Sequence, residues 1–279
     1  MLTARLLRKK TLYINIGPIF EGARELYRES PWGAALTRLI AFLEDLHYRL
    51  ADRAVVYAPS CLTPDLLKFR HKISIAARHF VDTDTFRVNK PLRDRERVIG
   101  YIGRLDADKG ILELLEAIPL VLEQSPDVAF FIGGDGRLRE RVAEIVSANN
   151  LGHKVRLSGW LSRREVAEHL NELRLCVLPS PTEGLPNIML ESMACGTPFL
   201  ATPVAGIPDV VKDGQTGFIM EDNSPLSIAR HILRALNSPL LEEVARNARA
   251  LVEKEFTYEA AVARYRALVA DVLGPARAK

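Results

Sequence analysis

Short apolar runs alternate with amphipathic stretches along most of the chain, in an order that predicts strands followed by helices. The predicted strands of the second part of the chain are the apolar runs at residues 98–102, 128–132, 155–157, 175–178, 199–202 and 218–220. Helices are predicted between them over residues 109–124, 137–149 and 162–173, the last with a capping box of Ser162 and Glu165. Apolar strands that alternate with helices predict a parallel sheet covered on both faces, in an α/β fold.

Before residue 90 the pattern of apolar and polar positions is thinner. Strand-like runs lie at residues 12–16, 54–57 and 73–76, with a helical stretch over 34–51 and a short helix over 64–69. The 34–51 stretch is amphipathic and carries charges of both signs, which favours a helix packed on a sheet over one lying on a membrane surface. Two or three strands cannot bury both faces of a complete domain, so we expect a partial domain here, with the boundary in the polar segment 89–97.

The composition describes an ordinary globular protein, with 48% hydrophobic and 26% charged residues. A formal net charge of +3 and the lack of a basic, aromatic stripe argue against nucleic acid as a partner. Cys61, Cys176 and Cys195 form no C-x-x-C pair, so we expect reduced cysteines in a cytoplasmic protein and no metal site. No apolar run approaches the roughly 18 residues of a membrane span, and the basic start is not expected to be a signal peptide.

Residues 179–198 carry the most informative chemistry of the chain. Pro186 suits the first position of a helix, where its missing N–H group costs nothing, and Gly196 followed by Pro198 suits the helix end. Three backbone N–H groups are then expected to point out of the positive end of this helix, those of Gly184, Leu185 and Asn187. Such a helix start predicts an anion site.

Two glutamates flank this predicted anion site. Glu183 lies on the loop before the helix, and Glu191 lies about one and a half turns inside it. Because carboxylates accept hydrogen bonds from hydroxyl groups, a phosphate site between them suits a sugar nucleotide. Taken alone, either glutamate is better explained as an acid that complements the helix dipole.

A second loop, residues 103–110, follows a predicted strand and opens the next helix. Arg104 offers a planar fork for phosphate oxygens, and Lys109 offers a compact point charge. Taken alone, this loop is better explained as solvated, with Asp106 and Asp108 neutralising the two cations.

The loops at Gly103, Gly133 and Thr182 directly follow strands, so they share the edge at which parallel sheets bind ligands. Gly134 and Gly136 suggest a dinucleotide motif, but its third glycine is absent, so NAD is not expected.

The order of these motifs is more specific than any one of them. Gly-Arg-x-x-x-x-Lys-Gly follows the first strand, Gly-Asp-Gly follows the second, and two glutamates eight positions apart precede the segment 193–211. This order resembles the nucleotide-sugar-binding half of the family 4 retaining glycosyltransferases, the group 1 glycosyl transferases, over residues 52–272. The resemblance implies a GT-B fold with a partial N-terminal Rossmann-like domain over 1–90, a complete C-terminal one over 91–256 and a return helix within 257–279.

The resemblance also implies roles for single residues. Arg104 and Lys109 would bind the donor diphosphate and stabilise its growing charge, while Glu183 would contact hydroxyls of the transferred sugar as the third catalytic residue. Glu191 would hold the ribose hydroxyls. The other residues expected to line the donor site are Gly103, Gly134, Gly159, Trp160, Leu161, Gly184, Leu185, Pro186 and Asn187. The family needs no metal, and we expect no cofactor besides the sugar nucleotide as co-substrate.

The implied reaction moves a sugar from a nucleoside diphosphate sugar to a hydroxyl acceptor, a sugar, lipid or glycan, with retention of configuration. Its pathways are glycan, glycolipid or cell-surface polysaccharide synthesis. These pathways lead us to expect a cytoplasmic protein, with peripheral contact at the inner face of the membrane as an alternative.

Two segments depart from the family pattern. In residues 78–86, which resemble the linker into the second domain, His79 and Phe80 replace the usual Asn-Gly. Residues 15–21 lack the histidine that many members carry there, and members have a longer N-terminal part, so we expect an N-terminally truncated member. Three explanations stay open: a fragment of an active enzyme, one chain of a split enzyme completed by a partner chain, and a binding module that transfers nothing.

Overall fold

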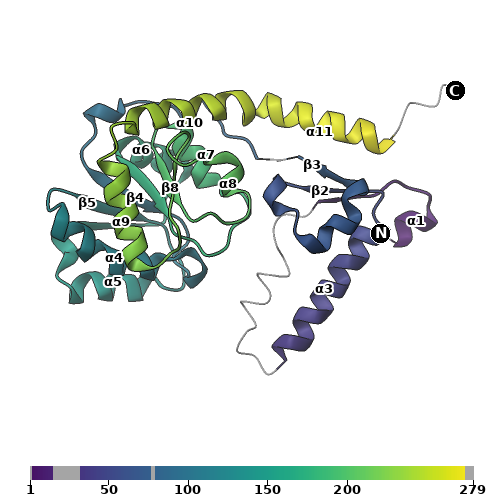
Figure 1. Ribbon diagram of the computed structural model, residues 1–279, viewed down its shortest axis with the longest axis horizontal. Coiled ribbons are helices and arrows are strands. Elements are labelled where there is room, and N and C mark those ends of the chain that lie inside the picture. The colour runs from purple at the N-terminus through teal and green to yellow at the C-terminus, as the bar shows by residue number, and fades with distance from the viewer. Residues whose placement is uncertain (1, 15–31, 77–78, 274–279) are drawn as a thin grey trace. The chain divides into compact units, whose positions relative to one another are not determined.

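The part of the chain that the computed structural model describes (Figure 1) comprises residues 2–14, 32–76 and 79–273. The chain forms two compact units. Unit 1 consists of Met1–His79 and Glu259–Lys279, and unit 2 consists of Phe80–Tyr258. Each unit contains its own parallel sheet with helices, which confirms the predicted α/β fold class.

Unit 2 is organised around six parallel strands in the order β6-β5-β4-β7-β8-β9. Their bounds are β4 Val98–Ile102, β5 Ala129–Gly133, β6 Val155–Gly159, β7 Leu175–Leu178, β8 Phe199–Ala201 and β9 Phe218–Ile219. Almost every residue of β4, β5, β7 and β8 is buried, because these strands are covered on both faces. Their apolar runs are therefore nearly continuous, which is why the sequence pattern located β4 and β7 at their observed bounds.

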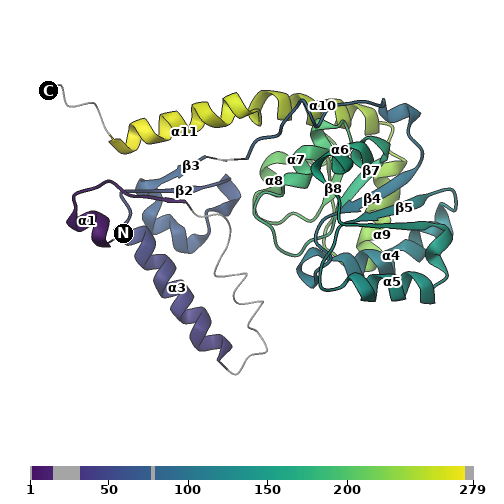
Figure 2. The same ribbon diagram turned by 180° about the vertical axis from the view of Figure 1, so that it is seen from behind.

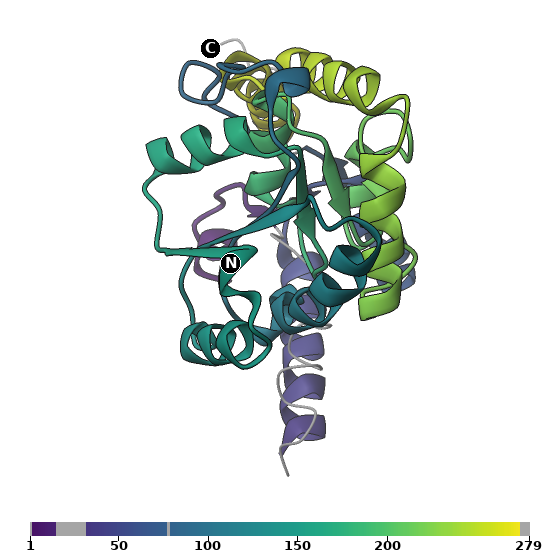
Figure 3. The same ribbon diagram turned by 90° about the vertical axis from the view of Figure 1, so that its left-hand side faces the viewer.

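Helices cover both faces of this sheet (Figures 1 and 3). α4, α5 and α9 lie on one face, while α6 and α7 lie on the other with α10 packed against α7, and Figure 2 shows the same layers from behind. The bounds are α4 Ile111–Gln124, α5 Arg139–Ala148, α6 Arg163–Glu172, α7 Asn187–Ala194, α8 Ile207–Val210, α9 Pro225–Leu236 and α10 Leu241–Glu255. The capping box of α6 is confirmed, whereas α8, α9 and α10 were not among the predicted helices.

The strand order reverses next to β4, which pairs with β5 on one side and with β7 on the other. The chain runs from β4 outward to β5 and β6, and then returns to β7 before continuing to β8 and β9. Open parallel sheets bind ligands beyond the carboxyl ends of their strands, at the point where the order reverses. The loops after β4 and β7 therefore flank the position at which a ligand is expected.

The described residues of unit 1 form three parallel strands in the order β1-β2-β3, with bounds Leu12–Ile14, Arg53–Val56 and Ile73–Ile75. The helices in this described part are α1 Leu2–Leu6, α3 Gly33–Leu50 and α11 Tyr258–Leu273, with 3₁₀ turns at Pro59–Cys61 and Pro64–Lys72. Ala54 and Val56 of β2 pack with Tyr48 of α3, while Val55 packs with Leu268 of α11, so the two helices cover opposite faces of this sheet. Residues 15–31, which include the segment 15–21, and Arg78 of the linker lie outside the described residues.

Helix α3 packs on the sheet through its C-terminal end. Tyr48 is fully buried, and its ring stacks on Phe69 at 5.5 Å between centroids. In contrast, Leu39, Phe42 and Leu43 on the preceding turns are 51%, 63% and 42% exposed. The predicted packing of this amphipathic helix on a sheet is therefore correct for its last turns only.

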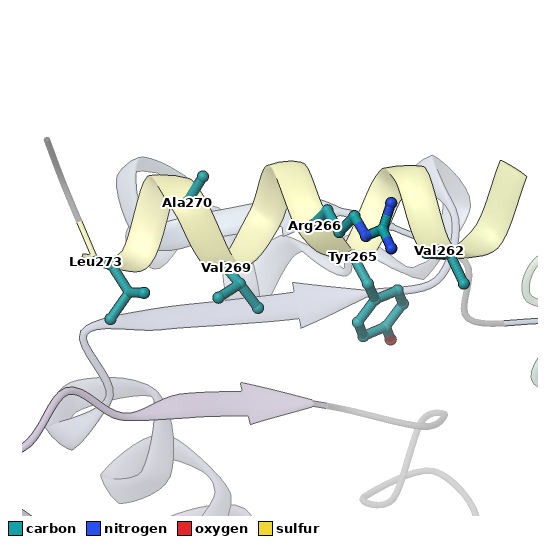
Figure 4. Close-up of a pocket in the computed structure, with 6 residues that line it drawn as sticks. All are labelled: Val262, Tyr265, Arg266, Val269, Ala270 and Leu273. Carbon is teal, nitrogen blue, oxygen red and sulfur yellow. The ribbon is translucent and has the colours of Figure 1, made fainter. Parts of the chain in front are cut away.

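Helix α11 carries an apolar groove of about 460 Å³, lined by Val262, Tyr265, Arg266, Val269, Ala270 and Leu273. Figure 4 shows Tyr265, Val269 and Leu273 pointing from the helix toward the strand beneath it. This groove belongs to unit 1 and is remote in sequence from the loops of the six-stranded sheet. No helix among the described residues is both long and apolar enough to cross a membrane.

Candidate functional site

The loops after β4 and β7 meet through an ion pair at the point where the strand order reverses. Lys109 Nζ lies 2.7 Å from Glu183 Oε1, and the two side chains are only 17% and 10% exposed. The neighbouring Gly110 has φ +68°, and a Cβ atom there would lie 2.1 Å from the carbonyl oxygen of Pro179. Glycine is therefore needed for the close approach of the two loops, and the approach brings the predicted Lys109 and Glu183 together.

Arg104 lies on the same loop and is bound by two carboxylates. Its Nη1 donates to Asp106 Oδ2, and its Nη2 donates to Asp108 Oδ2 at 2.7 Å. The hydroxyl of Tyr101, a buried residue of β4, donates to the backbone carbonyl of Arg104 at 2.5 Å. The arginine side chain is 57% exposed, so its guanidinium stands at the surface of the loop and can meet a ligand.

The loops after β4, β5 and β6 pack backbone against backbone. Gly134 N–H donates to Gly159 O at 2.7 Å, and Gly103 N–H donates to Gly133 O at 3.0 Å. Gly134 has φ +130°, and a Cβ atom there would lie 1.8 Å from Gly103 O. The three predicted residues Gly103, Gly134 and Gly159 therefore lie close together. Residue 134 has to be a glycine, because any side chain there would overlap the backbone of Gly103.

The start of α7 differs by one position from the prediction. Pro186 is the residue before the helix, with φ −71° and ψ +130°, and the helix begins at Asn187. A proline in this extended conformation ends the preceding loop, so the first helical N–H group is that of Asn187. Leu185 and Pro186 are buried, and Gly206 N–H donates to Gly184 O at 3.0 Å, which fixes the loop that leads into the helix.

Within the described part of the chain, the amides of Gly184, Leu185, Asn187 and Ile188 donate to no protein acceptor. No side chain caps this helix start either. Four free donors at the positive end of a helix are the arrangement that the predicted anion site requires.

Glu191 lies inside α7 and is partly buried. Burial raises the pKa of its carboxyl group above 4.5, and the charge of Arg163 opposes this effect. A partly desolvated carboxylate gains more from a hydroxyl donor than a solvated one does, because the donor replaces lost water.

Trp160 and Leu161 follow β6 and differ in their surroundings. The Trp160 side chain is 72% exposed, which makes its ring available to a ligand. Leu161 reaches over the end of β5, since a Cβ atom built on Gly133 would lie 2.6 Å from Leu161 Cδ1. Both predicted residues therefore stand at the same strand edge as Gly134.

A buried cation that was not predicted from the sequence supports this region. Arg95 is 5% exposed, and its Nη1 donates to Leu170 O and Leu173 O, each at 3.1 Å, and to Thr197 Oγ1 at 2.6 Å. Its Nη2 donates to Cys195 O at 2.7 Å, just beyond α7. Burial lowers the pKa of Arg95 to about 10. No sequence signal separated this arginine from the other charges of its polar segment.

Two solved structures have folds similar to this chain. Sucrose-phosphate synthase from Thermosynechococcus elongatus superposes with a TM-score of 0.76 at 23% identity, covering 98% of this chain and 71% of its own. The Anabaena protein HepE in complex with UDP and glucose superposes with a TM-score of 0.75 at 16% identity, covering 98% and 74% of the two chains. At these identities the likeness shows the fold alone.

Similarity in sequence is found with glycosyltransferases. Alpha-D-kanosaminyltransferase of Streptomyces kanamyceticus is 30% identical over 198 residues, which are 68% of this chain and 51% of that protein. The chain spans about half the length of the curated relatives it matches. The family model for glycosyl transferases group 1 matches residues 82–251, more than half of the chain and almost all of unit 2. The protein therefore belongs to the group 1 glycosyl transferase family.

Proposed function

We propose that unit 2 binds a nucleoside diphosphate sugar and that the protein transfers the sugar to a hydroxyl acceptor with retention of configuration. The observation that carries this proposal is the ion pair of Lys109 and Glu183 at the strand reversal, beside the four free amides at the start of α7. One cation and a helix start suit a diphosphate, and one carboxylate suits sugar hydroxyls. Unit 1 would then contribute to the acceptor side.

The diphosphate would be held by Arg104 and Lys109. The Arg104 guanidinium is exposed and can form paired hydrogen bonds with phosphate oxygens, while Lys109 adds a point charge at the centre of the site. Negative charge grows on the diphosphate as the bond to the sugar breaks, so both cations would stabilise the transition state more than the bound donor.

The two glutamates would hold the hydroxyl groups of the donor. Glu191 would accept from the ribose hydroxyls, since it is partly buried and belongs to the helix that starts at the proposed anion site. Glu183 would accept from hydroxyls of the transferred sugar, with the backbone at Gly184, Leu185 and Asn187 beside it. In the chain without ligand, the ion pair with Lys109 holds the Glu183 carboxylate beside the position proposed for the diphosphate.

The nucleobase would lie at the ends of β5 and β6. Gly134 lets the loops after β4 and β5 pack together at this edge, and Trp160 and Leu161 supply apolar surface.

In the proposed reaction, the bond between the anomeric carbon and the diphosphate oxygen breaks while the acceptor oxygen bonds to the same carbon from the same face. The acceptor proton moves to the leaving phosphate oxygen, which balances the step without a protein base. The acceptor would be a sugar, lipid or glycan hydroxyl, and the pathway glycan, glycolipid or polysaccharide assembly on the cytoplasmic side of a membrane.

A thermal-shift panel with UDP, GDP, ADP and their common sugar conjugates tests the donor site. Saturation at about one hundred times the dissociation constant adds roughly 2.7 kcal/mol, several degrees for a unit of this size. We expect a shift with one base that Glu191→Ala abolishes. We also expect Arg104→Ala to weaken binding of the diphosphate far more than binding of the nucleoside. A cooperatively folding sample that shifts with none of these ligands would refute the donor site, and sugar transfer to supplied acceptors tests the reaction.

A further inference from the structure

Asp106 and Asp108 differ in a way that their spacing does not reveal. The side chain of Asp106 is 8% exposed, whereas that of Asp108 is 37% exposed. Both carboxylates bind the same guanidinium, that of Arg104. Burial of an ionised carboxylate is unfavourable unless hydrogen bonds compensate for it, so Asp106 needs hydrogen-bond donors around it besides Arg104.

The compensation comes from the next loop of the site. Asp106 Oδ1 accepts from the backbone N–H of Arg137 at 3.0 Å and from Arg137 Nε at 3.3 Å, while Oδ2 accepts from Arg104. These bonds, above all the one from the Arg137 backbone, lower the pKa of Asp106 despite its burial. One oxygen thus fixes the carboxylate to the loop after β5, and the other binds the arginine.

The loop that holds Asp106 is itself rigidly placed. Leu105 N–H donates to Asp135 O at 2.9 Å, and Leu138 N–H donates to Leu105 O at 2.8 Å. A Cβ atom on Gly136 would lie 2.6 Å from Leu105 O, so the two backbones are in close contact. A carboxylate anchored in this way cannot follow the arginine. The arginine must adopt the direction that the carboxylate sets.

We propose that Asp106 is a positioning residue that holds the Arg104 guanidinium in the orientation needed to bind the donor diphosphate. This inference rests on the proposed function of the site. A long, exposed arginine side chain loses conformational freedom when it binds a ligand, and holding it in place beforehand reduces that loss. Asp108 lies at the solvated side of the guanidinium and would be displaced by phosphate oxygens without loss of the orientation.

Two variants of the full chain separate positioning from simple charge neutralisation. Asp106→Asn and Asp108→Asn each remove one negative charge next to Arg104. The amide oxygen in D106N can still accept from the backbone of Arg137, so the junction of the loops is retained while the bond to Arg104 is lost. If both aspartates only neutralised charge, each variant would strengthen diphosphate binding, because each removes repulsion.

Calorimetry with UDP, GDP and ADP identifies the diphosphate that the wild-type chain binds, and its nucleoside serves as the control ligand. We expect D106N to weaken diphosphate binding roughly tenfold and to leave nucleoside binding unchanged, the scale of one charge-assisted hydrogen bond. We expect D108N to leave diphosphate binding unchanged or to strengthen it. Stronger diphosphate binding in D106N would overturn the positioning role.

A readout without ligand separates this inference from the proposed function. The ¹H–¹⁵N heteronuclear NOE of the Arg104 Nε–H group should indicate a rigid side chain in the wild type and in D108N, and a mobile one in D106N. An equally rigid arginine in D106N refutes the positioning role. Absence of nucleotide binding by the wild type refutes the proposed function instead, whatever the NOE shows.

Discussion

Lys109 Nζ lies 2.7 Å from Glu183 Oε1, although the two residues are 74 positions apart in the sequence. The pair joins the loops after β4 and β7, the neighbouring strands at which the order of the sheet reverses. Both side chains are largely withdrawn from solvent, so their attraction is screened less than that of a surface pair. A ligand phosphate that binds Lys109 competes with Glu183, and a ligand hydroxyl that binds Glu183 competes with Lys109.

The competition predicts opposite effects for the two partners. Lys109→Met should weaken binding of a nucleoside diphosphate by about tenfold to a hundredfold, because a charge-assisted contact is lost. Glu183→Gln should strengthen it about threefold or more, because Lys109 is released and a negative charge is removed. Calorimetry on both variants checks the signs, with Lys254→Met, whose side chain is 80% exposed on α10, as the control. Weaker binding in both variants would contradict the competition.

The raised pKa of Glu191 predicts that nucleotide affinity depends on pH. In the proposed site the ionised carboxylate would accept two hydroxyl donors, so affinity should rise with pH from 4.5 through the pKa in the folded chain and then level off. Below that pKa the change approaches tenfold per pH unit. Glu191→Gln should remove this dependence, and a pH slope retained in E191Q would assign it to another group.

The same pKa has a consequence for stability. Without ligand, the folded chain holds the Glu191 proton more tightly than the unfolded chain does. Proton binding by Glu191 therefore stabilises the folded chain. Its contribution to the free energy of unfolding is fully present below pH 4.5 and is lost as the pH rises through the pKa of Glu191 in the folded chain. Thermal melts of the wild type and E191Q across this range should differ most at the higher pH.

Gly134→Ala should destabilise unit 2 and disrupt the site. The added Cβ would lie 1.8 Å from Gly103 O at a backbone φ of +130°. Strain and overpacking together should cost roughly 3 kcal/mol or more, about 6–12 °C in melting temperature. Gly152→Ala, where a Cβ atom would meet nothing within 4 Å, should change the melting temperature little. Equal melting temperatures for G134A and the wild type would show that the loops have room to separate.

Arg95→Met should destabilise unit 2 by about 2–4 kcal/mol, because three buried carbonyl groups at Leu170, Leu173 and Cys195 lose a donor. Arg95→Lys should recover little of this, since one ammonium cannot reach acceptors arranged around a planar fork. Denaturant unfolding measures the loss. Arg93→Met provides the matched control, because the Arg93 side chain is 75% exposed and should contribute less than about 0.5 kcal/mol.

Secondary structure in unit 2 could be predicted where burial is complete. The strands β4 and β7 have their predicted bounds, and the capping box of Ser162 and Glu165 opens α6 as expected. These features depend on neighbouring residues alone, which is why the sequence contains them. Helices α8, α9 and α10 were not predicted, although Ser224 caps the start of α9 and Pro225 occupies its first position. Helix α3 has an amphipathic pattern that only its last turns use for packing.

The sequence by itself determined the α/β class, the order of strands and loops along the chain, and the motifs that assign the family. The order of strands within the sheet, and with it the meeting of Lys109 with Glu183, was decided only by the tertiary structure. The same holds for the two aspartates, since Asp106 is buried by a loop 31 positions away. The physical reason is that periodicity along a chain reports how buried each segment is, whereas the partners of a charged side chain depend on which distant segments pack beside it.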